Sequence, residues 1–182
     1  MARNKKQVTG IPSHKKYEND GGPGIEKIME VLTKSDDPIK DKSNFLKSQL
    51  VFWLLAGIDG HAKNFSVFLV PGGISLTPLY DVVSAHPPIK KKEISLQKAK
   101  LAMAVGTSRH YKINEIISRH WLQTAKLTKF SQDKMEGIIH EVLESTDNVI
   151  NNVSRELPAD FPQELSDSIF AGMQANAKRL GK

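Results

Sequence analysis

The chain has 182 residues, 39% of them hydrophobic and 25% charged, with a formal net charge of +6 and no cysteine. A chain of this length buries about 70% of its unfolded surface, which is enough for one compact core. The composition excludes a disulfide framework, a thiolate metal site and a span of roughly 20 apolar residues, and we expect neither a signal peptide nor a membrane, which makes cytoplasmic the default.

The opening segment is basic, since its five cations all precede the first acidic residue, Glu18. A solvated terminus is the preferred interpretation and a nucleic-acid contact the alternative. We assign residues 1–24 to a basic N-terminal arm with a Gly-rich loop, and residues 25–182 to a single domain. The Gly-rich loop is a poor phosphate cradle because Pro23 lacks a backbone donor. The cations are Arg3, Lys5, Lys6, Lys15 and Lys16.

Two helices are expected before the centre of the chain. Apolar residues at helical spacing from Ile25 to Leu32 predict a short one. A longer one is expected from about Asp41 or Lys42 to Ala56, with Gly57 ending it. Its tryptophan, Trp53, is expected to be a core residue rather than a platform for a ligand.

A β-hairpin is predicted next, from a strand over residues 65–70, a turn over 71–73 and an alternating strand over 74–77. A hairpin folds its far end back beside its start. Asp81 is therefore expected to return to the neighbourhood of Asp59 and Asn64, and to bring two carboxylates and a carboxamide to one end of a small sheet.

These side chains suit phosphoryl transfer. The protein-kinase catalytic loop has Asp and Asn at the same spacing as Asp59 and Asn64, followed by a second metal-binding Asp. Asp59 is expected to accept the proton of an attacking hydroxyl, and Asn64 and Asp81 to offer oxygen ligands to Mg²⁺ bridging ATP phosphates. Lys63 adds positive charge near the phosphoryl group. Taken alone, such an Asp and Asn pair is more often joined by a loop hydrogen bond.

His61 has a competing interpretation as a transition-metal ligand. This is the weaker account, because no third His or Cys is nearby.

The second half of the chain is expected to be mostly helical. After Asp81 the chain enters a Pro-bounded loop with a lysine cluster, and residues 100–104 form a short strand or extended segment. Helices follow over residues 118–128 and from a Ser131 cap to about Glu156, and Pro162 begins a terminal helix. The fold class is therefore α+β, predominantly α-helical, and resembles a protein-kinase C-lobe with one small β-hairpin between the catalytic loop and the metal-binding Asp81.

Lys126 and Lys129 lie one turn apart at the end of a predicted helix. Cations at this position offset the helix dipole, and they can also contact phosphates. The pattern alone favours neither interpretation.

Six motifs in order resemble the C-terminal half of the HipA toxin kinases, and together they run over nearly the whole chain. The most informative is Gly57-Ile58-Asp59-Gly60-His61-Ala62-Lys63-Asn64-Phe65-Ser66. The others are Leu76-Thr77-Pro78-Leu79-Tyr80-Asp81, Lys100-Leu101-Ala102-Met103, Lys15-Lys16-Tyr17-Glu18 with Asp20-Gly21-Gly22-Pro23-Gly24, Arg119-His120-Trp121 with Thr124-Ala125-Lys126, and Leu157-Pro158-Ala159-Asp160-Phe161-Pro162.

The resemblance implies a serine/threonine protein kinase that uses ATP and magnesium. By motif position it makes Asp59 the catalytic base and Asn64 and Asp81 the metal ligands, with His61 inside the signature. It also implies an aminoacyl-tRNA synthetase as substrate, whose phosphorylation halts translation and favours dormant, drug-tolerant, persistent cells. The implied partner is a small DNA-binding antitoxin on operator DNA. In that assembly Lys126 and Lys129 are expected to contact phosphates.

Members of this family are much longer than the chain. The half without a counterpart here carries a nucleotide-covering loop, a phosphate-pairing lysine and an autophosphorylated serine. A short reading frame, a truncated product and an expressed fragment all fit the sequence. The alternative to a kinase lobe is therefore a non-catalytic binding module or remnant that engages an antitoxin or a separate N-lobe partner.

Overall fold

The computed structural model describes residues 2–4, 16–70 and 73–181, with only the backbone described for residues 2–4 and 70. The expected turn residues Pro71 and Gly72 lie outside the described residues. So do the basic-arm residues Lys5, Lys6 and Lys15.

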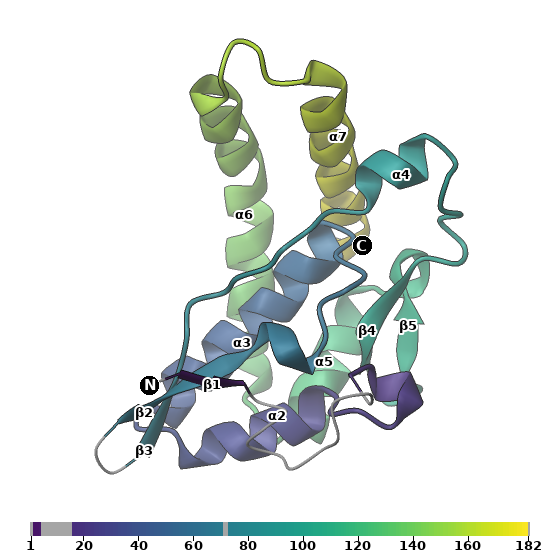
Figure 1. Ribbon diagram of the computed structural model, residues 1–182. Coiled ribbons are helices and arrows are strands. Elements are labelled where there is room, and N and C mark those ends of the chain that lie inside the picture. The colour runs from purple at the N-terminus through teal and green to yellow at the C-terminus, as the bar shows by residue number, and fades with distance from the viewer. Residues whose placement is uncertain (1, 5–15, 71–72, 182) are drawn as a thin grey trace.

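The fold is α+β and predominantly helical, as predicted (Figure 1). A long helix, α3, runs through the middle, α6 packs beside it, and α6 and α7 project together as an antiparallel pair. The helices are η1 (Glu18–Asp20), α2 (Ile25–Val31), η2 (Leu32–Lys34), α3 (Pro38–Leu54), η3 (Ala62–Asn64), α4 (His86–Lys90), η4 (Ile113–Glu115), α5 (Ser118–Leu127), α6 (Gln132–Glu156) and α7 (Gln163–Leu180).

Two small antiparallel sheets accompany the helices. The predicted hairpin is β2 (Ser66–Val70) with β3 (Gly73–Leu76), and Val67 is opposite Leu76 in its register. The backbone of β1 (Ala2–Asn4) pairs with the outer edge of β2. The structure adds a second hairpin, β4 (Lys100–Val105) with β5 (His110–Lys112), where the sequence indicated at most one short strand.

One helix start and one loop differ from the expectation. Helix α3 begins at Pro38 because the Asp37 side chain accepts the Lys40 amide at 3.1 Å, and Pro suits the first turn. The Pro-bounded loop contains the short helix α4. Helix α6 does begin after Ser131, whose hydroxyl accepts the Lys134 amide at 3.3 Å.

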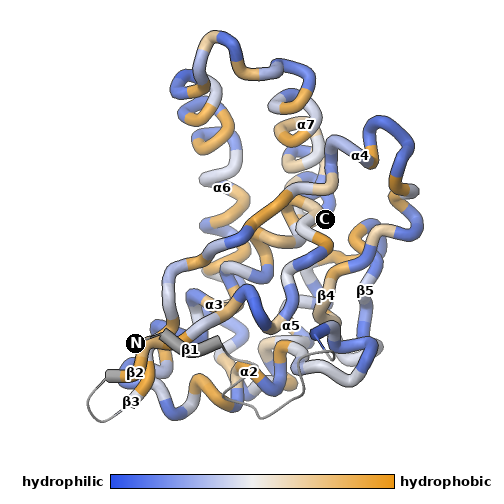
Figure 2. The backbone as a smooth tube through the Cα atoms, in the orientation of Figure 1, coloured by the Kyte–Doolittle hydropathy of each residue, from blue (hydrophilic) through white to orange (hydrophobic). Residues whose placement is uncertain are grey.

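The core forms around α3. Trp53 is fully buried, its ring lies edge-on to that of Trp121 at 6.4 Å, and its indole N–H donates to the Ile113 carbonyl at 3.0 Å. The expectation that Trp53 is a core residue is confirmed. Figure 2 shows hydrophobic residues recurring between polar ones along α6 and α7, as in helices with one buried face.

The C-terminal end of α3 is closed by a left-handed turn. The Gly57 amide donates to the Phe52 carbonyl at 2.6 Å and the Ala56 amide to Trp53 at 3.1 Å, which is a Schellman arrangement. Ala56, with φ of 51°, is the left-handed residue, whereas the sequence suggested Gly57. Asn176 and His86 donate to the buried carbonyl of Leu54, at the end of the helix, at 3.2 and 2.9 Å. These bonds fix where the next loop starts.

The β2–β3 hairpin is held to α3 by a buried carboxylate. Asp41 accepts the Ser35 hydroxyl and the backbone amide of Leu76, the latter at 2.8 Å. A carboxylate in this position is satisfied by two donors, as a buried charge requires. Asp41 thereby fixes the end of β3, from which the chain runs towards Asp81.

His86 gives the fold an expected pH dependence. Burial lowers the pKa of His86 below its ordinary value of 6.5. Between the folded-state pKa and 6.5, the imidazole of His86 is protonated in the unfolded chain and neutral in the folded chain. The contribution of His86 to stability is therefore fully present above pH 6.5 and is lost as the pH falls towards the folded-state pKa. Within that window the free energy of unfolding should change by up to about 1.4 kcal/mol per pH unit for this residue.

Urea unfolding of wild-type and His86→Gln protein across this pH range measures the effect. The variant should show the shallower slope of stability against pH. Equal slopes for the two proteins would contradict the assignment.

Within the described residues, no helix is long and apolar enough to cross a membrane.

Candidate active site

The loop after α3 presents Asp59 to solvent. The side chain of Asp59 is 56% exposed, although the residues on both sides of this short loop are largely buried. Phe52 explains this shape, because its ring packs directly under the loop backbone. A Cβ atom at Gly57 would lie 2.5 Å from that ring, and one at Gly60 2.8 Å. The two glycines let the loop close over Phe52 with Asp59 at its tip.

Replacing Gly60 by Ala should therefore displace the loop. The added methyl group would meet ring atoms of Phe52 rather than the end of a flexible side chain. We expect a loss of about 1–3 kcal/mol in the free energy of unfolding, as for overpacked cores. Urea unfolding measures it, with Gly137→Ala as the control because open space surrounds a Cβ there. A Gly60→Ala protein as stable as wild type would contradict this account of the loop.

Asn64 and Asp81, both predicted site residues, meet directly. The Asn64 Nδ2 group donates to Asp81 Oδ2 at 2.7 Å, and the Asn64 side chain is 2% exposed. The other end of the carboxamide, Oδ1, accepts the backbone amide of His61 at 3.1 Å. Asp81 has φ of 57°, a left-handed conformation that Asp tolerates better than most residues. The hairpin therefore returns Asp81 to Asn64 as the sequence indicated.

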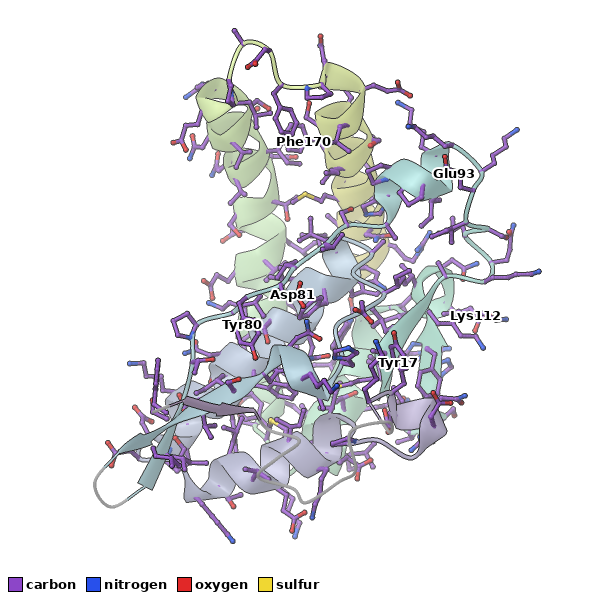
Figure 3. The ribbon with its side chains drawn as sticks, in the orientation of Figure 1. Tyr17, Tyr80, Asp81, Glu93, Lys112 and Phe170 are labelled. Atoms are coloured by element: carbon purple, nitrogen blue, oxygen red, sulfur yellow. The ribbon has the colours of Figure 1, made fainter. Side chains whose placement is uncertain are left out.

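The return segment is anchored beside the loop. The Tyr80 hydroxyl donates to the Lys63 carbonyl at 2.7 Å and lies 2.7 Å from the Ser66 hydroxyl. Tyr80 and Asp81 both lie on the segment that leads from β3 towards α4 (Figure 3). These contacts bind the two halves of the predicted site to each other. The Lys63 side chain is half-buried.

The Asp59 carboxylate has partners that the sequence did not indicate. The Tyr17 hydroxyl donates to Asp59 Oδ1 at 2.5 Å, and Lys16 Nζ lies 3.7 Å from the same oxygen. His61 Nε2 is 3.5 Å from this oxygen. Within the described residues no hydrogen bond joins the Asp59 carboxylate to Asn64 or Asp81. The structure therefore connects Asp59 to them through the loop backbone, where the His61 amide donates to the Asp59 carbonyl at 2.8 Å.

His61 is buried beneath these groups. Burial lowers its pKa below 6.5, with the Asp59 carboxylate acting in the opposite direction. The ring lies edge-on to Tyr17, with centroids 5.4 Å apart. In the part of the chain that the structure describes, its Nδ1 atom has no hydrogen-bond partner. His61 thus shapes the floor of the site as a neutral ring.

A cleft of about 480 Å³ opens beside Asp59. Tyr17 and Asp59 line it on one side, and Lys98 and Lys100 add positive charge. Figure 3 shows Tyr17 near β4, away from Tyr80 and Asp81. Asp59 therefore borders an open cleft whose lining carries two carboxylates, its own and that of Asp20, and two lysines.

The oxygen atoms of Asn64 and Asp81 suit magnesium. Mg²⁺ commonly binds one or two protein oxygen ligands and takes the rest from water and phosphate. The described residues contain no group of three or more His, Cys, Asp or Glu side chains arranged for a metal. The 2.7 Å contact is itself a hydrogen bond from Asn64 Nδ2 to Asp81 Oδ2, and Asn64 Oδ1 accepts the His61 amide, so the pair could offer an ion the Asp81 carboxylate and the remaining lone pair of Asn64 Oδ1.

Lys126 and Lys129 lie apart from this loop in the contacts that the structure shows. Lys126 is in the last turn of α5, and Lys129 follows it with φ of 53°. Both are exposed, and within the described chain neither forms an ion pair. Their position at the helix end is as predicted.

Tyr17 and Lys16 are the functional candidates that residue spacing missed. Forty-two residues separate Tyr17 from Asp59 in sequence, and no periodic pattern relates them. The only signal was their membership in one of the motifs that resemble a known family.

Comparison with known proteins supplies the family. The sequence model of the HipA-like C-terminal domain matches residues 4–150. The Sinorhizobium fredii protein named "Putative kinase Y4mE" is 27% identical over 177 residues, which are 96% of this chain and 40% of that protein. The serine/threonine-protein kinase toxin HipA of Shewanella oneidensis is 32% identical over 89 residues, 43% of this chain and 21% of the toxin.

The fold has a close counterpart among solved structures. It matches a chain in the complex of HipA, HipB and operator DNA from the Shewanella oneidensis toxin–antitoxin system with a TM-score of 0.85 and 21% identity. The match covers 98% of this chain and 43% of the other. The chain thus spans about two fifths of the length of its full-length relatives.

Proposed function

The chain belongs to the HipA-like C-terminal domain family, and from that premise we propose that it is the catalytic lobe of an ATP- and magnesium-dependent serine/threonine protein kinase. One observation carries the proposal. The exposed Asp59 is followed five residues later by Asn64, and the hairpin brings Asp81 Oδ2 to 2.7 Å from Asn64 Nδ2. Enzymes that transfer phosphoryl groups use these three residue types in this order.

Asp59 is the proposed base. Its carboxylate is exposed at the cleft and already accepts a hydroxyl hydrogen, that of Tyr17. An acceptor hydroxyl in this position would be oriented towards the phosphoryl group and would pass its proton to Asp59 as its oxygen bonds to phosphorus.

Asn64 and Asp81 are the proposed ligands of the magnesium ion that accompanies ATP. When bound, that ion neutralises charge on the phosphate oxygens. Support for this role comes from the hairpin, which brings Asp81 beside Asn64, and from Asn64 Oδ1, which accepts the His61 amide and keeps one lone pair for an ion. Lys63 and His61 support the site as a nearby cation and a neutral ring.

The proposed partners follow the relatives. The matched Shewanella oneidensis complex holds HipA with HipB and operator DNA, so we propose a DNA-binding antitoxin for this chain and phosphate contacts from Lys126 and Lys129 when that complex is on DNA. The proposed substrate is a protein Ser or Thr hydroxyl, on an aminoacyl-tRNA synthetase in the bacterial cytoplasm, and the proposed consequence is persistence.

The proposed division of the chain remains residues 1–24 as an arm and residues 25–182 as the lobe. The end of the arm is well packed, because Glu18 accepts the Ala104 amide of β4 at 2.6 Å. This contact makes residues 16–24 part of the site's surroundings.

The test is transfer of labelled phosphate from ATP to protein, measured with the chain alone and with the N-terminal half of a HipA relative added. Magnesium-dependent label on serine or threonine in either mixture supports the kinase lobe. No transfer in both mixtures, together with no ATP binding by calorimetry, would contradict it and favour the alternative of a binding module for an antitoxin or a separate N-lobe.

A further inference from the structure

Tyr17 occupies the place that an acceptor hydroxyl needs. Its phenol oxygen is 2.5 Å from Asp59 Oδ1, on the open side of the catalytic loop and in the wall of the cleft. A base that accepts a proton must lie within hydrogen-bond reach of the hydroxyl oxygen, at no more than about 3.2 Å. Tyr17 meets this requirement without any bound substrate, since it belongs to the same chain as the base.

The segment that carries Tyr17 is fixed by its neighbour. The Glu18 carboxylate accepts the Ala104 amide at 2.6 Å, and Arg109 Nη1 lies 3.1 Å from its other oxygen. A Cβ atom at Gly24 would lie 2.2 Å from the Glu18 carboxyl carbon, so the chain passes very close to this anchor. The phenol is therefore held at Asp59 by the fold rather than placed there by a freely moving arm.

The charges around the phenol suit an arriving phosphoryl group. Lys16 Nζ lies 4.8 Å from the centre of the Tyr17 ring and 3.7 Å from Asp59 Oδ1, which places a cation beside both oxygens. The hydrogen bond to Asp59 is the main cause that raises the pKa of Tyr17, so the phenol keeps its proton at neutral pH. It is a hydroxyl nucleophile with a base already in contact.

We propose that Tyr17 is a phosphorylation site of this same chain, modified by its own active site. The inference rests on the proposed kinase function. In the step, the Tyr17 oxygen forms a bond to the γ-phosphorus of ATP, the bond from that phosphorus to the bridging oxygen breaks with its electron pair leaving on ADP, and the phenol proton passes to Asp59.

The modification would also remove the occupant of the site. Phosphotyrosine has no proton to donate to Asp59 and carries a charge of about −1.5 to −2 at neutral pH. Placed against a carboxylate, that charge repels it, and the phosphorylated side chain should turn away from Asp59 while Glu18 keeps the backbone of the segment anchored. Phosphorylated protein would then leave Asp59 open to the hydroxyl of a separate protein.

Tyr111 provides a matched control. It lines the same cleft, but its hydroxyl accepts a hydrogen bond from Arg109 Nη2 at 2.7 Å instead of contacting Asp59. If exposure in the cleft alone determined modification, both tyrosines would be modified. Contact with the base predicts modification of Tyr17 only.

The experiment is mass spectrometry of the full chain after incubation with ATP and Mg²⁺, alone and with the N-terminal half of a HipA relative, using wild-type, Tyr17→Phe, Tyr111→Phe and Asp59→Asn proteins. Casein is added as a general serine and threonine acceptor. The expected result is phosphate on Tyr17 in wild type and Tyr111→Phe, and none in Asp59→Asn. The first-order rate constant for modification of Tyr17 should not change when the protein is diluted tenfold.

The outcomes separate the two claims. Label on casein without phosphate on Tyr17 overturns this inference and leaves the kinase function standing. A rate on Tyr17 that falls on dilution, or equal modification of Tyr111, also overturns it. No label on any protein overturns both.

Discussion

Changing Asp59 to Asn should lower the rate of phosphoryl transfer by about 10²- to 10⁴-fold, the contribution of a general base to such reactions. The carboxamide keeps the size of the side chain and can still accept the Tyr17 hydrogen bond, but it cannot take a proton. Because Asp59 is 56% exposed, the fold should hardly change, and the melting temperature should stay within a few degrees of wild type.

Initial rates with labelled ATP, together with thermal unfolding, measure both effects. Asp167→Asn makes the same chemical change at an exposed position on α7 and should transfer at the wild-type rate. Near wild-type transfer by Asp59→Asn would show that another group is the base. A lost fold would instead show that Asp59 is structural.

Changing Asp81 to Asn should reduce the rate of phosphoryl transfer at least about 100-fold at low magnesium concentration. This is more than the loss usually seen when a residue that only hydrogen-bonds to a metal ligand is removed. The substitution removes the one negative charge that the pair formed by Asn64 and Asp81 offers a cation. Asn tolerates the left-handed backbone of Asp81 and can accept the Asn64 hydrogen bond, so the local structure should persist.

A magnesium titration of the transfer rate distinguishes this role from a structural one. For the Asp81→Asn protein the curve should shift to higher magnesium, with part of the rate regained at saturation. Asp160→Asn, at an exposed position beyond α6, should follow the wild-type curve. An unshifted curve with a uniformly lower rate would mean that Asp81 does not hold the metal.

The sequence predicted those parts of the fold that local signals specify. Turn residues and alternation located the β2–β3 hairpin, and with it the meeting of Asn64 and Asp81. The serine cap and apolar stripe located α6. In each case the local conformational preference agrees with the tertiary structure, and under that condition an element can be predicted from its sequence.

Long-range packing accounts for what the sequence did not reveal. Tyr17 reaches Asp59 because its neighbour, Glu18, accepts a hydrogen bond from Ala104 of β4. Both contacts join residues that are far apart in the sequence. The role of Phe52 beneath Gly57 and Gly60 depends on how a helix end turns. The β4–β5 hairpin was missed because its strands are short and interrupted by irregular register.

The measurement that tests the central claim most directly is a crystal structure of the chain with Mn²⁺ and a non-hydrolysable ATP analogue, with the N-terminal half of a HipA relative added. Anomalous scattering locates the manganese independently of the protein atoms. We predict a metal within about 2.5 Å of oxygens of Asn64 and Asp81, with the γ-phosphate on the Asp59 side. A nucleotide and metal bound elsewhere, with these two side chains still bonded only to each other, would contradict the account.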